Sequence, residues 1–160
     1  MRAAIVTVST SKSRGEGEDE SGARLAAFAE AVGAEIAGRD LIPDQRDLIE
    51  ERLRHWSDVE HCELVLTTGG TGFAPSDVTP EATRAVLERE APGLAEAMRE
   101  ASRAHTRNWM LSRAVAGIRG STLIVNFPGS PRSIAQAGEA IADALPHAVA
   151  LIRERSTPHG

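Results

Sequence analysis

A three-layer α/β/α domain, with a mostly parallel central sheet and one antiparallel strand, is the fold class that this sequence predicts. Short runs of aliphatic and β-branched residues, such as residues 3–8 and 63–67, alternate with longer segments whose apolar residues recur at helical spacing. Two glycine-containing loops each follow a strand-like run and precede a helix. At 160 residues the chain suits one domain, so we expect a single unit over residues 1–160.

Turn and cap residues divide the first half of the chain. A buried strand opens it, a polar segment follows as a flexible surface loop, and an amphipathic helix then ends at Gly33, which suits a helix end. Pro43-Asp44 ends the second strand and begins another helix, which Asp44 can cap. In order we expect strand 3–8, loop 9–20, helix 22–32, strand 35–42, helix 44–56 and strand 63–67.

The second half adds three helices and a hairpin. Thr79-Pro80 and Ser130-Pro131 both place a cap residue before a proline at the first helical position. Arg119-Gly120 is a link short enough for a hairpin, which makes one strand antiparallel, and Pro146 should kink or divide the last helix. In order we expect helices 80–90 and 92–105, strands 114–118 and 121–125, a helix from 131, and a frayed tail over 156–160.

Composition argues against several classes of function. The net charge of −5 disfavours nucleic-acid binding, because such proteins carry a basic face that displaces counterions from phosphates. The single Cys62 cannot form an internal disulfide, and no apolar run reaches the length of a membrane span. The five histidines lack the companions typical of zinc sites. With no recognisable leader segment, we expect a cytoplasmic protein that binds neither nucleic acid nor membrane.

The glycine-rich turn after the third strand is the strongest functional signal. Gly69, Gly70 and Gly72 allow consecutive backbone N–H groups to point into one concavity, where they can bind an anion such as phosphate. Asp77 follows, two residues outside the helix that Thr79 caps, so capping does not explain this carboxylate. A carboxylate beside a phosphate pocket requires a cation between them, which suggests bound Mg²⁺. The alternative is that the glycines only form a tight turn.

Both glycine-containing loops, residues 69–72 and 126–131, lie where strands end and helices begin. Open α/β sheets bind their ligands at the carboxyl ends of the strands, so the two loops should face one crevice. The first strand is not followed by G-x-G-x-x-G, which argues against a Rossmann-type dinucleotide site.

Five motifs, in order along the chain, resemble those of the MogA/MoaB family of molybdenum-cofactor biosynthesis proteins. They are LVLTTGGTG (64–72), DVTPEAT (77–83), Pro92-Gly93-Leu94 with Met98-Arg99, Leu111-Ser112-Arg113, and NFPGSP (126–131). The likeness runs from Ile5 to Ile134, and five ordered motifs are more specific than one glycine loop. Residues 112–117 resemble the MoaB branch, and residues 77–80 resemble the MogA branch.

The resemblance implies an α/β domain that binds molybdopterin and, in the MogA branch, adenylates it with ATP and Mg²⁺ as a nucleotidyltransferase. It implies that Asp44 and Asp77 are the catalytic acids and the Mg²⁺ ligands. It also implies a homo-oligomer, commonly a trimer, with hexamers in some MoaB proteins. The ligand-binding positions that it implies are Thr68, Gly69, Gly70, Thr71, Gly72, Ser112, Asn126, Pro128, Gly129 and Ser130, with Asp19, Ser21 and Gly22 from a D-x-S-G segment.

The sequence departs from the family pattern at one position. Many relatives have an Asp after the serine that ends the first strand, where this chain has Thr10.

The expected activity is transfer of AMP from Mg-ATP to the molybdopterin phosphate, with release of pyrophosphate. The alternatives are a non-enzymatic molybdopterin carrier and an oligomeric scaffold. Two acids beside the anion loops favour the enzyme, since a pure binder of the pterin phosphate has no use for them.

The scarce large apolar side chains that could anchor an oligomer interface are Trp56, Trp109 and Met110.

Overall fold

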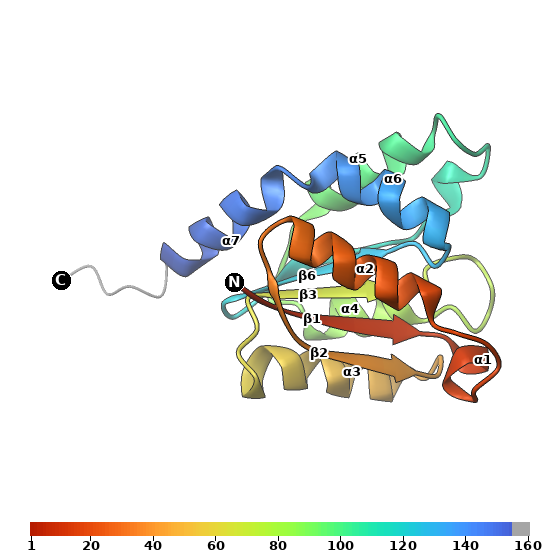
Figure 1. The fold of residues 1–160 in the computed structure, drawn as a ribbon, viewed down its shortest axis with the longest axis horizontal. Helices are drawn as coiled ribbons and strands as arrows, with labels where there is room; N and C mark the ends of the chain where they lie inside the picture. The colour runs from red at the N-terminus through yellow and green to blue at the C-terminus, as the bar shows by residue number, and fades with distance from the viewer. Residues whose placement is uncertain (155–160) are drawn as a thin grey trace.

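The computed structural model describes residues 1–154, which form a six-stranded sheet between two layers of helices (Figure 1). The elements in chain order are β1 (Arg2–Val8), α1 (Thr10–Ser13), α2 (Glu20–Ala31), β2 (Glu35–Ile42), α3 (Arg46–Arg54), the π-helical turn η1 (His55–Val59), β3 (Leu64–Thr68), α4 (Thr79–Val86), β4 (Arg89–Glu90), α5 (Pro92–Ser102), the 3₁₀ turn η2 (Trp109–Leu111), β5 (Ala116–Arg119), β6 (Thr122–Phe127), α6 (Pro131–Ile141) and α7 (Ala144–Glu154). The tail expected over 156–160 lies outside the described residues.

The sheet has the strand order β2-β1-β3-β6-β5-β4. β1 pairs in parallel with β2 and β3, and β3 pairs in parallel with β6. β5 is antiparallel to both of its neighbours, β6 and β4, which confirms the predicted hairpin and the mostly parallel α/β/α class. In Figure 1 the arrows of β1, β2 and β3 point to the same end of the sheet, where α1 lies. That end therefore collects the carboxyl ends of the parallel strands.

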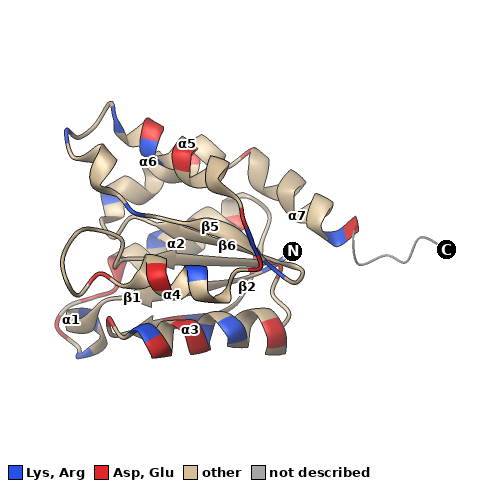
Figure 2. Ribbon diagram, turned by 180° about the vertical axis from the view of Figure 1, so that it is seen from behind, with Lys and Arg blue, Asp and Glu red and all other residues tan. Residues whose placement is uncertain are grey.

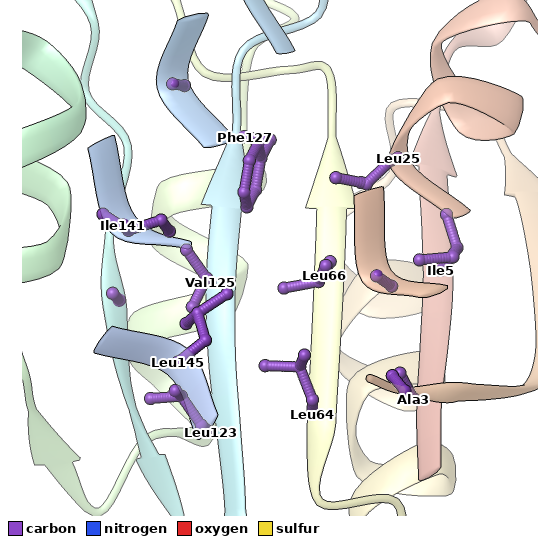
Figure 3. Packing of buried hydrophobic residues seen from close by; sticks show 14 of the residues in the cluster. Ala3, Ile5, Leu25, Leu64, Leu66, Leu123, Val125, Phe127, Ile141 and Leu145 are labelled. Carbon is purple, nitrogen blue, oxygen red and sulfur yellow. The ribbon is translucent and has the colours of Figure 1, made fainter. Parts of the chain in front are cut away.

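Alternate residues of the central strands pack against opposite helical layers. Ala3 and Ile5 of β1 belong to a core cluster completed by α2, α5, α6 and α7, part of which Figure 3 shows. Ala4 and Val6 belong to the cluster under α3 and α4. This period of two is the strand repeat, and both faces of the sheet are buried as in parallel sheets generally. Figure 2 shows acidic and basic residues together on α3, where Arg46 and Arg54 both lie 3.9 Å from Glu50.

The segment expected as a flexible loop, residues 9–20, is more ordered than predicted. The Ser9 side chain accepts a hydrogen bond from the backbone N–H of Lys12 and caps α1. Asp19 accepts from Gly22 N at 2.9 Å, so α2 begins at Glu20, two residues before the expected start. Both hydrogen bonds satisfy backbone donors that a helix start otherwise leaves unpaired. α2 ends at Ala31, one residue before the predicted end, and Gly33 follows its C-cap with a φ of 97°.

Other element boundaries also differ from prediction. α4 ends at Val86 instead of residue 90, because Leu87 is extended and residues 89–90 pair with β5 as the short strand β4. α4 begins at Thr79 itself, so Thr79 is not its N-cap. The last helix divides before α7 begins at Ala144, and Pro146 lies in the first turn of α7, where its missing N–H is tolerated. Among the described residues, no helix is long and apolar enough to cross a membrane.

Candidate phosphate-binding and catalytic site

The two glycine-containing loops lie side by side at the carboxyl ends of β3 and β6. The Thr68 hydroxyl donates to the Pro128 carbonyl at 2.7 Å, and a Cβ at Gly129 would lie 3.3 Å from Gly69 Cα. A cavity of about 420 Å³ opens beside them, lined also by the end of β1, by α1 and by the start of α2. The crevice predicted from the order of strands and loops is therefore present.

Gly69 and Gly70 give the first loop its shape. Their φ angles are 96° and 69°, in the left-handed region that side chains disfavour. A Cβ at Gly69 would collide with the Val8 carbonyl oxygen, and one at Gly70 would collide with Thr79 Oγ1. No side chain therefore fits at either position, and Gly69 lines the cavity with its backbone alone. Backbone N–H groups in such turns are suited to binding anions.

Asp44 lies at the end of β2 and does not cap α3. The N-cap of α3 is Gln45, which makes no side-chain capping hydrogen bond. Asp44 Oδ2 instead accepts from the Thr10 hydroxyl at 2.8 Å and from Thr10 N at 3.1 Å. Asp44 N returns a hydrogen bond to the Thr10 hydroxyl at 2.9 Å. The carboxylate is therefore fixed through Oδ2, while Oδ1 lies beside Gly70.

Thr79 places a second oxygen at the same point of the site. Its hydroxyl is buried and has no hydrogen-bond partner among residues 1–154. Thr79 Oγ1 and Asp44 Oδ1 both lie within 3.2 Å of the position that a Cβ at Gly70 would occupy. A buried unpaired hydroxyl is uncommon in a native structure and calls for an explanation. Oxygen donors gathered in this way fit a hard cation such as Mg²⁺.

Asp77 lies outside α4, as the sequence predicted. Its Oδ2 accepts from Ala74 N at 3.0 Å, and its own N–H donates to the Ala74 carbonyl at 2.9 Å. The same carboxylate oxygen lies 2.9 Å from the position of a Cβ at Gly72, so Asp77 faces the glycine loop.

No group of three or more His, Cys, Asp or Glu side chains in the described chain could hold a metal ion. Mg²⁺ carried by a nucleotide needs only one or two carboxylates, because phosphates and water supply its other ligands.

Arg113 is a site residue that sequence reasoning missed. Its Nε donates to the Gly72 carbonyl and its Nη2 to the Asp77 carbonyl, both at 2.7 Å. Its Nη1 pairs with both oxygens of Glu81, at 3.0 and 2.8 Å. This pairing lowers the pKa of the Glu81 carboxyl and raises that of the guanidinium. The Leu-Ser-Arg motif contains Arg113, but the sequence does not reveal which carbonyls it reaches.

Lys12 is the second residue that was missed. It lies in α1 and lines the cavity together with Thr68, Gly69 and Gly129. The polar, glycine-containing segment around it indicated only a solvated loop. In the fold it places one positive charge beside the anion-binding turns, where it can attract a phosphate.

Asn126 holds the sheet together instead of facing the crevice. Its side chain is fully buried, with Oδ1 accepting from Val115 N at 3.1 Å. Nδ2 donates to the hydroxyls of Thr67 and Thr83, both at 3.0 Å. These hydrogen bonds join β6 to β3, to α4 and to the residue before β5, so the position implied for ligand binding has a structural role here.

The remaining predicted positions lie around the same end of the sheet. Ser21 Oγ donates to the Gly129 carbonyl at 2.7 Å, and Asp19 caps α2 while accepting from Thr7 Oγ1 at 2.8 Å. Ser130 caps α6, as predicted, by accepting from Ser133 N. Ser112 precedes Arg113, whose N–H donates to the Thr71 carbonyl at 2.8 Å and so brings Ser112 next to the glycine loop.

Fold and site together define a class of protein: an α/β protein with two carboxylates beside a glycine-rich turn at the carboxyl ends of its parallel strands. Comparison with known proteins identifies the family. Residues 4–147 match the family described as "Probable molybdopterin binding domain". The chain belongs to this molybdopterin-binding family, which confirms the resemblance to MogA and MoaB proteins.

Individual relatives agree with this assignment. The chain is 47% identical over 113 residues to the molybdopterin adenylyltransferase of Helicobacter pylori (strain J99), covering 71% of this chain and 64% of that protein. It is 49% identical over 113 residues to the Drosophila melanogaster molybdenum cofactor synthesis protein cinnamon, covering 71% of this chain and 19% of that protein. The chain thus spans less than two thirds of either relative. The crystal structure of the molybdopterin biosynthesis enzyme MoaB from Thermus thermophilus superposes with a TM-score of 0.89 at 46% identity, covering 94% of this chain and 95% of that one.

Proposed function

We propose that the protein is a molybdopterin adenylyltransferase, which transfers AMP from Mg-ATP to the terminal phosphate of molybdopterin. The observation that carries this proposal is the pair of acids, Asp44 and Asp77, directed at Gly70 and Gly72 of the anion-binding turn. The name of the H. pylori relative supports the same reaction. A protein that only held a pterin phosphate would gain nothing from two carboxylates facing its phosphate turn.

In the proposed reaction a phosphate oxygen of molybdopterin attacks the α-phosphorus of ATP. The new P–O bond forms as the bond from the α-phosphorus to the bridging oxygen breaks, and pyrophosphate leaves. A phosphate is already a competent nucleophile at neutral pH, so the site must mainly orient two anions and offset their charge. Bound Mg²⁺ would supply charge neutralisation on the triphosphate.

Different residues at this end of the sheet would carry out these tasks, and Asp44 and Asp77 lie beside the glycine turn, outside the lining of the cavity of about 420 Å³. Asp44 and Asp77 would hold the Mg²⁺, with the Thr79 hydroxyl beside Asp44. The backbone N–H groups of residues 68–72 would bind one phosphate. The N-terminus of α6 at Ser130 would bind another anion, because its unpaired N–H groups and helix dipole favour negative charge. Lys12 would add a mobile positive charge at the wall of the cavity.

The test is to incubate the protein with molybdopterin and Mg-ATP and to measure adenylyl-molybdopterin and pyrophosphate. We expect both products from the wild type and neither from Asp77→Asn, which keeps the side chain's size but removes the charge. Molybdopterin binding should persist in that variant. Binding of both ligands without turnover by the wild type would instead identify a carrier.

A further inference from the structure

Arg113 joins the two segments that carry the anion turn and Asp77. It follows the 3₁₀ turn η2 and precedes β5, and its backbone and side chain together make four kinds of contact. The N–H donates to Thr71, the Nε to the Gly72 carbonyl, the Nη2 to the Asp77 carbonyl and the Nη1 to the Glu81 carboxylate. The side chain alone thus fastens both ends of the loop 72–77 and the first turn of α4.

The ion pair between Arg113 and Glu81 adds little to the stability of the fold. The Arg113 and Glu81 side chains are 34% and 35% exposed, and ion pairs with that much contact with water contribute little to folding. Arg113 binds the carbonyls of Gly72 and Asp77, which are the two end residues of the loop 72–77. The tip of this loop contains Phe73, whose side chain is 67% exposed. A loop with so few buried side chains needs another constraint to keep one conformation.

We infer that Arg113 is a positioning residue that holds the Asp77 carboxylate against the glycine turn, where this carboxylate would help to bind the Mg²⁺ of Mg-ATP, an inference that rests on the proposed function. A planar guanidinium can donate in three directions at once, to two carbonyls and a carboxylate, whereas a lysine ammonium is a point charge without this fork. Glu81 offsets the charge of Arg113 and fixes its plane. Arg113 thereby acts through Asp77 and not on the substrate directly.

The chain contains a matched control for this inference. Arg119 also donates through Nε and Nη2 to a carboxylate, that of Asp58, at 3.1 and 2.7 Å, and through Nη1 to the Val86 carbonyl at 2.9 Å. It lies at the opposite end of the sheet, because its pairing partner Thr122 is the first residue of β6. Arg119→Met removes a similar set of hydrogen bonds without touching the crevice.

The experiment compares wild type, Arg113→Met, Arg113→Lys and Arg119→Met by two measurements. Amide hydrogen exchange on the ligand-free protein reports the order of residues 72–78, and titration reports the affinity for Mg-ATP. For both Arg113 variants we expect the exchange rates of these amides and the Kd for Mg-ATP to rise by about tenfold or more. A small displacement of a catalytic carboxylate has an effect of at least this size. Molybdopterin affinity should stay within about twofold, since the α6 loop is untouched. Arg119→Met should match wild type in both measurements.

Two results would overturn the inference. One is wild-type exchange and nucleotide affinity in Arg113→Met. The other is equal losses in Arg113→Met and Arg119→Met, which would reduce Arg113 to a general structural role. A wild-type protein that binds Mg-ATP but forms no adenylyl-molybdopterin would contradict the proposed function, while the exchange and affinity data would still decide the role of Arg113.

Discussion

At the scale of single residues, the structure explains how a carboxylate at the end of a strand becomes available to a ligand. Asp44 could have capped α3, but Thr10 engages its Oδ2 with both a hydroxyl and a backbone N–H. A hydroxyl can donate to the carboxylate while accepting from Asp44 N, which an aspartate at position 10 could not do. The Thr10 hydroxyl thus binds both the carboxylate and the backbone N–H of Asp44.

We predict that Thr10→Val lowers the rate of adenylation by about tenfold, a loss of about 1.4 kcal/mol of transition-state stabilisation. Valine keeps the branched shape but removes the hydroxyl, so Asp44 Oδ2 loses its 2.8 Å hydrogen bond and the carboxylate can rotate. Stability should fall by only about 1 kcal/mol. Turnover assays and urea unfolding measure the two effects.

Ser13→Ala is the control, because it removes the hydrogen bond from Ser13 Oγ to the Thr10 carbonyl without touching Asp44. An equal loss of turnover in Ser13→Ala would show that the integrity of α1 matters and the Thr10 hydroxyl does not.

We predict that the Glu81–Arg113 ion pair makes the stability of the protein depend on pH in the acid range. The pairing lowers the pKa of Glu81 below its ordinary value of 4.5, so its contribution to stability is complete above that pH and is lost as the pH falls through the lowered pKa. Between about pH 5 and 3, unfolding free energy should therefore fall more steeply for wild type than for Glu81→Gln. The difference should stay below about 1 kcal/mol and shrink in salt, since both side chains are partly exposed. Parallel pH profiles from urea titrations would contradict this role for the pair.

At the scale of elements, three helices begin at the end of the sheet where the carboxyl ends of the parallel strands lie. α1, α2 and α6 begin there with side-chain caps from Ser9, Asp19 and Ser130. Each cap pairs one backbone N–H and leaves others in the first turn available, together with the positive end of the helix dipole. All three helix starts contribute residues to the lining of the cavity, so the candidate site is built as much from helix ends as from side chains.

We predict that Ser130→Asp weakens molybdopterin binding far more than Mg-ATP binding. Aspartate also caps helices well, so the fold should be nearly unaffected and the melting temperature should match that of the wild type. Its fixed charge would repel an anion at the start of α6. Separate titrations with the two ligands decide this: equal losses would mean that both ligands use this loop, and no loss would remove it from the site.

At the scale of the whole molecule, burial changes the candidates for an oligomer interface. Trp56 is only 8% exposed, packs in the core under α3 and donates to Asp40 at 2.6 Å, so it cannot anchor a partner. Trp109 is half-buried under Arg103, whereas Met110 is 58% exposed. Of the three side chains considered from sequence, Met110 is the most exposed and is therefore the best candidate for an interface residue.

We predict a homotrimer, with a mass in light scattering of about three times 17.0 kDa. Met110→Lys should shift this mass toward the monomer, because a charge would be buried at the interface. Val59→Lys is the matched control, since Val59 is 63% exposed and lies on η1. A wild-type mass near 17.0 kDa across the micromolar range would refute the trimer, and equal effects of the two variants would place the interface elsewhere.

The sequence by itself determined the fold class, the antiparallel hairpin and the glycine turn after β3, because these depend on local rules. Residue periodicity identified the strands and helices, and Gly33, Gly69 and Gly70 marked positions where the backbone needs a positive φ. Asp77 could be placed outside a helix because a proline fixes the start of α4 nearby. Ordered motifs then supplied the family.

Tertiary structure alone decided which polar groups serve the site, because their partners are distant in sequence. Thr10 meets Asp44 across 34 residues, and Arg113 meets Asp77 across 36. The same long-range pairing places Asn126 inside the sheet, where three hydrogen bonds satisfy it. A hydrogen bond between side chains leaves no periodic trace in a sequence, so only the fold could separate the residues that face the crevice from those that support it.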